Sequence, residues 1–260
     1  MGARIDELER FFAGFPHLPR EAILKEDLLR SGLAFAAEAL TQNEDGTVKP
    51  KSYFIFSFDH KPLVELGEAA RRRPPEEIAL TGGPYELRRT IVSVRTNPDS
   101  PYHVAPDADG RLALWLEGQR LADVALPPMP AYYRHRLGNG KSVMEIAPTI
   151  QWGYLIYLTV LRLCQYFGAK EECRFCDINH NWRQHKALGR PYTGVKPVDE
   201  VLEALAIIDR YDTEKASQAY TITGGSITSH VEGLREAEFY ARYAEAIERA
   251  LPPLRLPRWS

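Results

Sequence analysis

The chain has 260 residues, of which 44% are hydrophobic, so it can form one large domain or two ordinary ones with a buried core. Its formal net charge of −2 shows none of the basic excess that proteins binding nucleic acid usually carry. The N-terminus has no apolar signal segment, and the longest apolar run, residues 154–161, is too short to span a bilayer. We therefore expect a cytoplasmic protein with no membrane partner and no general affinity for nucleic acid.

The first half of the chain has the pattern of a mixed α+β domain. Apolar residues recur at helical spacing over residues 5–12 and 20–29, and Pro19 is placed to begin the second helix. Proline-rich residues 126–130 mark a boundary, so residues 1–130 are expected to form an accessory α+β domain. Strands are expected at residues 51–58, 88–94, 112–116 and 121–126.

The second half alternates between strand and helix patterns. Residues 154–163 are almost uninterruptedly apolar, which suits a strand buried on both faces of a parallel sheet. An amphipathic crossover helix is expected over residues 197–208, followed by a short strand at 219–223. This alternation predicts parallel β/α units, in which ligands gather at the C-terminal ends of the strands.

A last helix is expected to open at a capping box formed by Ser229 and Glu232. In such a box, each of the two side chains accepts a hydrogen bond from the backbone N–H of the other residue. The residues that follow at helical spacing predict an inner face made of Leu234, Ala237, Ala241, Ala244 and Ile247.

All three cysteines lie in one short stretch directly after the strand expected at residues 154–163. Cys164, Cys173 and Cys176 have the spacing C-x8-C-x2-C, and an odd, clustered set of thiols cannot form a closed disulfide framework. Soft thiolate ligands at this spacing suit a metal ion or an iron–sulfur cluster. Three thiolates leave one iron of a [4Fe–4S] cluster open to a substrate or cofactor.

A glycine pair, Gly224 and Gly225, follows the second expected strand as the cysteines follow the first. Because neighbouring parallel strands end at the same edge of a sheet, the two motifs are expected to face each other across a ligand-sized gap. Without side chains, the glycine backbone can approach a ligand closely and offer its carbonyl groups to an ammonium group.

This order of motifs, over roughly residues 150–250, resembles the radical S-adenosylmethionine (radical SAM) superfamily. The resemblance implies the first β/α units of a partial TIM-like barrel over residues 150–260. It also implies that Cys164, Cys173 and Cys176 bind a [4Fe–4S] cluster. The usual family spacing is C-x3-C-x2-C, so the longer first gap here implies an extra loop before the cluster.

The resemblance further implies the cofactor site and the reaction. Phe175 would pack near the adenine of S-adenosylmethionine (SAM), and Gly224, Gly225 and Ser226 would bind its methionyl amino group. Ser226 stands where an acidic residue is common in the family. The enzyme would reductively cleave SAM to start radical chemistry on an unknown substrate, with electrons from a donor such as flavodoxin or ferredoxin.

A structural zinc site is the alternative interpretation of the same thiols. Cys164, Cys173, Cys176 and His180 have the spacing C-x8-C-x2-C-x3-H, which supplies the four donors of a tetrahedral Cys3His site. On this alternative, the protein is a non-catalytic binding module stabilised by zinc.

Chain length gives one further expectation. A βαβ unit takes about 30 residues or more, so six units need on the order of 180 residues, more than follow residue 154. We therefore expect a fragment of a longer enzyme, or a sheet that another chain completes. The isolated polypeptide is expected to be catalytically incompetent, because two β/α units leave the cofactor open to water.

Overall fold

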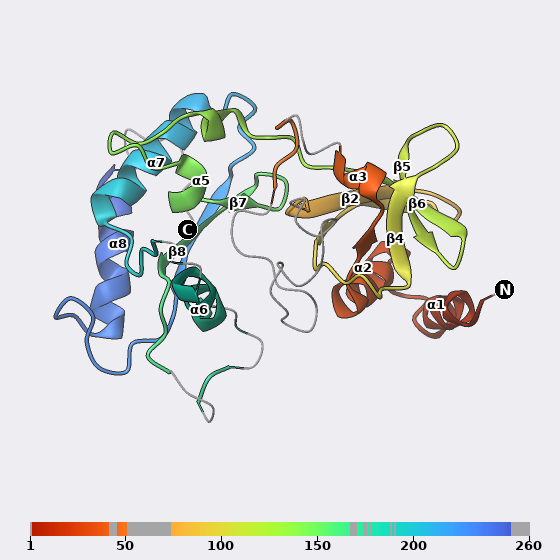
Figure 1. The fold of residues 1–260 in the computed structure, drawn as a ribbon, viewed down its shortest axis with the longest axis horizontal. Helices are drawn as coiled ribbons and strands as arrows, with labels where there is room; N and C mark the ends of the chain where they lie inside the picture. Colours follow the sequence, from red (N-terminus) through yellow and green to blue (C-terminus); the bar gives the residue numbers. More distant parts are fainter. Residues whose placement is uncertain are drawn as a thin grey trace. The chain divides into compact units, whose positions relative to one another are not determined.

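The computed structural model describes residues 2–41, 46–50, 74–166, 171–173, 176, 178–187, 189 and 191–250. The chain folds into two compact units, Met1–Met129 and Pro130–Ser260 (Figure 1). Each unit is mixed α/β, with its own hydrophobic core and an open sheet. Within the described ranges no helix is long and apolar enough to cross a membrane.

The first unit is built on a six-stranded sheet with the order β1-β4-β5-β6-β2-β3. β1 pairs parallel with β4, whereas the other neighbours pair antiparallel. The strands are β1 Ala34–Phe35, β2 Glu77–Gly82, β3 Leu87–Ser93, β4 Tyr102–Pro106, β5 Leu112–Leu116 and β6 Gln119–Ala125.

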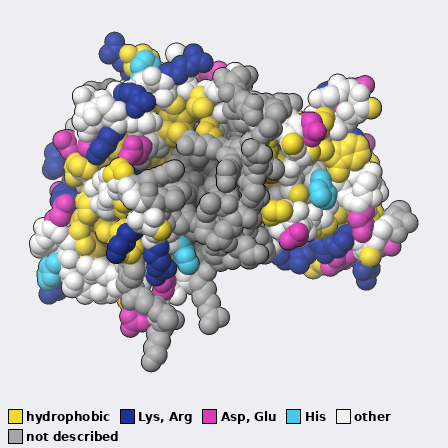
Figure 2. All heavy atoms as spheres, in the orientation of Figure 1, with side chains coloured by type: hydrophobic (Ala, Val, Ile, Leu, Met, Phe, Trp, Pro, Cys, Tyr) yellow, Lys and Arg dark blue, Asp and Glu magenta, His cyan; other side chains and the backbone are white. Residues whose placement is uncertain are grey.

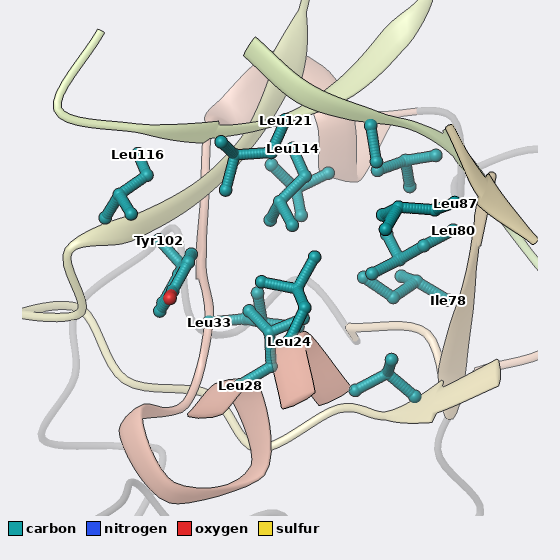
Figure 3. Packing of buried hydrophobic residues seen from close by; sticks show 14 of the residues in the cluster. Leu24, Leu28, Leu33, Ile78, Leu80, Leu87, Tyr102, Leu114, Leu116 and Leu121 are labelled. Atoms are coloured by element: carbon teal, nitrogen blue, oxygen red, sulfur yellow. The ribbon is translucent and has the colours of Figure 1, made fainter. Parts of the chain in front are cut away.

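Among the described residues, three helices accompany this sheet: α1 Ala3–Gly14, α2 Arg20–Ser31 and α3 Ala37–Thr41. Figure 3 shows how leucines of α2 and of the strands share one core, in which Leu24, Leu80 and Leu114 are completely buried. The predicted first two helices are confirmed, as are the strands at 88–94, 112–116 and 121–126, with small shifts at their ends. The strand predicted at residues 51–58 lies outside the described residues.

The second unit is built on a three-stranded sheet with the order β7-β8-β9. The strands are β7 Thr149–Ile150, β8 Leu155–Leu161 and β9 Ala219–Gly224. β8 and β9 are parallel, with Leu155 opposite Ala219 and Leu161 opposite Gly224, whereas β7 is antiparallel to β8. The prediction that residues 154–163 and 219–223 form adjacent parallel strands is therefore confirmed.

The helical segments of this unit are η2 Ala131–Arg134, α5 Val143–Ile146, α6 Ile178–Ala187, α7 Val198–Tyr211 and α8 Glu236–Ala250. α7 is the predicted helix between the two parallel strands, and it buries Val201, Leu205 and Ile208. These residues share one core with Ile156 and Leu158 of β8. α7 also packs beside α8, as Figure 1 shows.

The predicted start of the last helix is wrong. α8 begins at Glu236, and the backbone N–H of Arg235 donates to the carboxylate of Glu238 at 3.0 Å. This bond is half of a capping box, six residues after the one predicted from sequence. Ser229 instead donates to the side chain of Gln165, a partner 64 residues away that the local pattern cannot reveal.

The predicted inner face is also wrong for its three alanines, whereas Ile247 is buried and Leu234, which precedes α8, packs against the core as a partly buried residue. Ala237, Ala241 and Ala244 are exposed. The helix is rotated so that its large aromatic side chains are inside, because burying them removes more apolar area from water than burying alanines does. The buried residues are Phe239, Tyr243, Ala246 and Ile247.

Candidate cofactor site at the ends of β8 and β9

The cysteine-containing loop leaves β8 at the edge where β9 ends in the glycine pair. The backbone N–H of Gly225 donates to the carbonyl oxygen of Leu161 at 3.0 Å. A Cβ atom built on Gly225 would lie 2.0 Å from the carbonyl oxygen of Leu163 and 2.6 Å from the Cα of Cys164. The glycines therefore lie at the same end of the sheet as the first cysteine, as the sequence predicts. The ligand-sized gap expected between the two motifs is wrong at this point, because Gly225 packs directly against the backbone of Leu163 and Cys164.

Close packing explains why both positions are glycine, a structural role that the sequence analysis did not include. A Cβ on Gly224 would lie 2.6 Å from both the carbonyl oxygen of Leu161 and the hydroxyl of Tyr240. The Tyr240 hydroxyl donates to the carbonyl oxygen of Gly225 at 2.7 Å. Burial, with the nearby Glu236 and Cys164 adding to it, raises the pKa of Tyr240 to about 12, so the hydroxyl remains a donor. Tyr240 thus uses one lone pair of the Gly225 carbonyl, and no second donor to this oxygen is found among the described residues.

Gln165 ties the start of the cysteine loop to the loop between β9 and α8. Its Oε1 accepts from the backbone N–H groups of Thr228 and Ser229, at 2.7 and 2.8 Å, and from both of their hydroxyls at 3.2 Å. Its Nε2 donates to the carbonyl oxygen of His230 at 3.1 Å. Its backbone N–H donates to the carbonyl oxygen of Ser226 at 3.0 Å. Sequence analysis missed this residue, because no local pattern identifies hydrogen bonds across more than 60 residues.

Asn179 holds the same loop from α6. Its side chain is almost completely buried; Oδ1 accepts from the backbone N–H of Cys164, and Nδ2 donates to the carbonyl oxygen of Tyr166, both at 3.3 Å. Arg183 of α6 pairs with Glu172 of the loop at 2.7 Å, and its hydrogen bond lowers the pKa of that carboxyl group. The loop is therefore anchored at both ends to the helix that follows it.

None of the three cysteines is part of a disulfide. The backbone N–H of Cys176 donates to the carbonyl oxygen of Cys173 at 3.2 Å, so these two cysteines share one turn, whereas Cys164 lies at the end of β8. Three soft thiol donors fit a [4Fe–4S] cluster chemically. In the described ranges, however, no three His, Cys, Asp or Glu side chains converge tightly enough to hold a metal ion. His180, the fourth donor of the zinc alternative, lies on α6, and Phe175 lies outside the described residues.

Gln165→Ala is expected to loosen the cysteine loop. The substitution removes the side-chain hydrogen bonds to Thr228, Ser229 and His230, at a cost of about 1–3 kcal/mol in unfolding free energy. Because Cys164 precedes Gln165, its thiol should be alkylated several-fold faster in iron-free protein, as mass spectrometry of the labelled peptides would show.

Two variants make this prediction specific. Gln165→Glu keeps the oxygen that accepts from Thr228 and Ser229, so it should restore most of the protection of Cys164. Gln218→Ala removes a glutamine whose Nε2 donates to the nearby carbonyl of Lys215, so it should leave the alkylation rate unchanged. Equal rates in Gln165→Ala and the wild type would contradict the anchoring role.

The edge of the parallel strand pair thus carries a thiol loop, a glycine pair and the polar side chains that connect them. No family model, curated protein or solved structure matches the chain. A function is therefore inferred from the site itself.

Proposed function

We propose that the protein is a radical SAM enzyme. The observation that carries the proposal is the contact of Gly225 with Leu163 and Cys164, where a Cβ atom would overlap both backbones. It means that the thiol loop and the glycine pair meet at the C-terminal ends of two parallel strands. Open α/β sheets bind their ligands at this edge.

Cys164, Cys173 and Cys176 would hold a [4Fe–4S] cluster with one open iron. When bound, this group supplies one-electron cleavage of SAM, with electrons from a donor such as flavodoxin or ferredoxin. The protein's own contribution is to orient the loop and the cofactor. Asn179 accepts from the backbone N–H of Cys164, and the side chain of Gln165, the next residue, accepts from the backbone N–H of Thr228, so the chain is held at Cys164 and directly after it.

SAM would lie between the thiol loop and the residues after β9. Gly224, Gly225 and Ser226 would contact its methionyl amino group through backbone carbonyls, and Phe175 would pack near its adenine. The remaining lone pair of the Gly225 carbonyl supports this arrangement, because Tyr240 occupies only one of the two.

The parallel strands would be the first two of a partial TIM-like barrel, in a cytoplasmic enzyme with an accessory domain at residues 1–130. One side of the sheet packs on α7 and α8 through buried apolar residues of β8. The other side has partly buried hydroxyl groups, since Tyr157 pairs with Thr221 and Thr159 with Thr223. Register partners in parallel strands share a face, so these hydroxyls would line the barrel interior.

Anaerobic reconstitution with iron and sulfide tests the proposal. We expect the absorption and electron paramagnetic resonance spectra of a [4Fe–4S] cluster, and a change in the paramagnetic signal when SAM is added. Cys176→Ala should prevent cluster formation while leaving the fold intact, because Cys176 is only partly buried and forms no disulfide. A spectrum that SAM leaves unchanged would contradict the enzyme proposal, even if a cluster forms.

Metal analysis of protein purified without oxygen decides between this proposal and the zinc alternative. Iron that survives His180→Ala is expected for the cluster. One tightly held zinc ion per chain that is lost in this variant would instead indicate a Cys3His module.

A further inference from the structure

The segment leaving β8 carries a guanidinium group that forms no ion pair with any residue the structure describes. Arg162 follows the last residue of β8 and precedes Cys164 by two positions. Among the described residues its side chain forms one contact, with Tyr192, and no ion pair. A partly buried arginine usually has an acidic partner or another acceptor. Arg162 has neither for its side chain among the described residues, so its N–H groups are available to water or a ligand.

Aromatic packing holds this guanidinium in place. The Cζ of Arg162 lies 4.3 Å from the centroid of the Tyr192 ring, and the Tyr192 hydroxyl donates to the Arg162 carbonyl oxygen at 2.6 Å. His185 of α6 packs edge-on against Tyr192, with 4.9 Å between the ring centroids. Stacking uses the face of the guanidinium and leaves its in-plane donors available.

A second basic side chain lies close to Arg162. Lys196 is almost completely buried, and its Nζ donates to the carbonyl oxygen of Ile146 at 2.7 Å. Burial and the charge of Arg162 both lower the pKa of Lys196, whereas Glu145 and Glu200 act in the opposite direction. Glu200 is itself paired with Lys141 at 2.6 Å. The two basic side chains are therefore close enough for the charge of Arg162 to disfavour the protonated form of Lys196.

We propose that Arg162 binds an anionic ligand group, a carboxylate or a phosphate, at the C-terminal edge of β8. A guanidinium can form two parallel hydrogen bonds with either group, and a fixed orientation reduces the entropy lost on binding. Figure 2 shows lysine, arginine and histidine side chains over the region of α6, which adds a favourable field for an anion. This site does not depend on a bound iron–sulfur cluster.

Titration with inorganic phosphate and with acetate, at constant ionic strength, tests the proposal in iron-free protein. We expect saturable binding of at least one of the two anions by calorimetry, and a loss of about tenfold or more in affinity in Arg162→Gln. Arg162→Lys should lie between, because an ammonium keeps the charge but loses the bidentate geometry. Arg249→Gln is the matched control, since Arg249 is an exposed residue of α8 that pairs only with Glu245.

Tyr192 provides a second test that leaves the charge of Arg162 intact. Tyr192→Phe keeps the ring, so it should bind the anion nearly as the wild type does, whereas Tyr192→Ala should weaken binding. Saturable binding by folded Arg162→Gln with wild-type affinity would overturn the proposal. So would the absence of saturable binding of either anion by the wild type.

The source of the anionic group is distinguished in cluster-loaded protein. If Arg162 binds the carboxylate of SAM, Arg162→Gln should weaken the binding of SAM but not of decarboxylated SAM. If Arg162 binds a substrate, Arg162→Gln should leave the affinities for SAM and for decarboxylated SAM unchanged, while the binding of phosphate or acetate is lost. A failure to load iron would contradict the radical SAM proposal, and the anion titration would still decide the role of Arg162.

Discussion

Gly225→Ala is expected to separate the ends of β8 and β9. The new Cβ atom would lie 2.0 Å from the carbonyl oxygen of Leu163 and 2.6 Å from the Cα of Cys164. Both are backbone atoms, so the strain cannot be relieved by rotating a side chain. We expect a loss of unfolding free energy at or above the upper end of the roughly 1–3 kcal/mol typical of overpacking.

Urea unfolding of the two glycine variants Gly225→Ala and Gly138→Ala would measure this effect. Gly138 belongs to the same unit, and a Cβ atom there would meet only the carboxylate of Glu203 at an ordinary 3.5 Å. We therefore expect a small change for Gly138→Ala and a large one for Gly225→Ala. If both variants unfold at the urea concentration of the wild type, the close contact between the two motifs is wrong.

Lys196→Met is expected to change how stability depends on pH. Burial lowers the pKa of Lys196 to about 7 in the folded state, whereas an unfolded chain has a lysine pKa of about 10.4. Between these values the unfolded state binds a proton that the folded state does not, so the unfolding free energy of the wild type rises with pH. Below about pH 7 both states are protonated, and this contribution becomes constant.

The contribution of Lys196 to the unfolding free energy rises by at most about 1.4 kcal/mol per pH unit. The unfolding free energy of the wild type relative to Lys196→Met should therefore rise by about 2 kcal/mol from pH 7 to pH 9. Lys186→Met, at an exposed position on α6, should keep the wild-type dependence. Parallel profiles for the wild type and Lys196→Met between these pH values would show that the ammonium group is not buried as described.

The parallel strand pair could be predicted because its signals are local. The run at residues 154–163 is too apolar for a one-sided strand, and the helix at 197–208 has a clear buried face. β2 has no such signal, since it follows Glu76 and begins with Glu77, charged residues that are nevertheless almost completely buried. The rotation of α8 was missed because alanine and aromatic residues offer two competing apolar faces, and only the core decides between them.

The candidate site was predictable only in part. The order of motifs indicates that Cys164 and Gly225 lie at one edge of the sheet, which follows from the parallel pairing of the strands. Asn179 and Gln165 could not be identified, because their roles depend on hydrogen bonds to residues brought close by the fold. Arg162 was missed for the same reason, since its partner Tyr192 is 30 residues away.

The bonds of Gln165 also set an order of assembly during synthesis. Its side-chain partners lie 63 to 65 positions further along the chain, so they form only after the whole crossover between β8 and β9 has been made. Contacts of such long range form late, because the intervening chain loses entropy before they can stabilise anything. On the ribosome, the thiols and their α6 anchors Asn179 and Arg183 emerge close together, whereas the bonds of Gln165 form only once Thr228, Ser229 and His230 have left the exit tunnel.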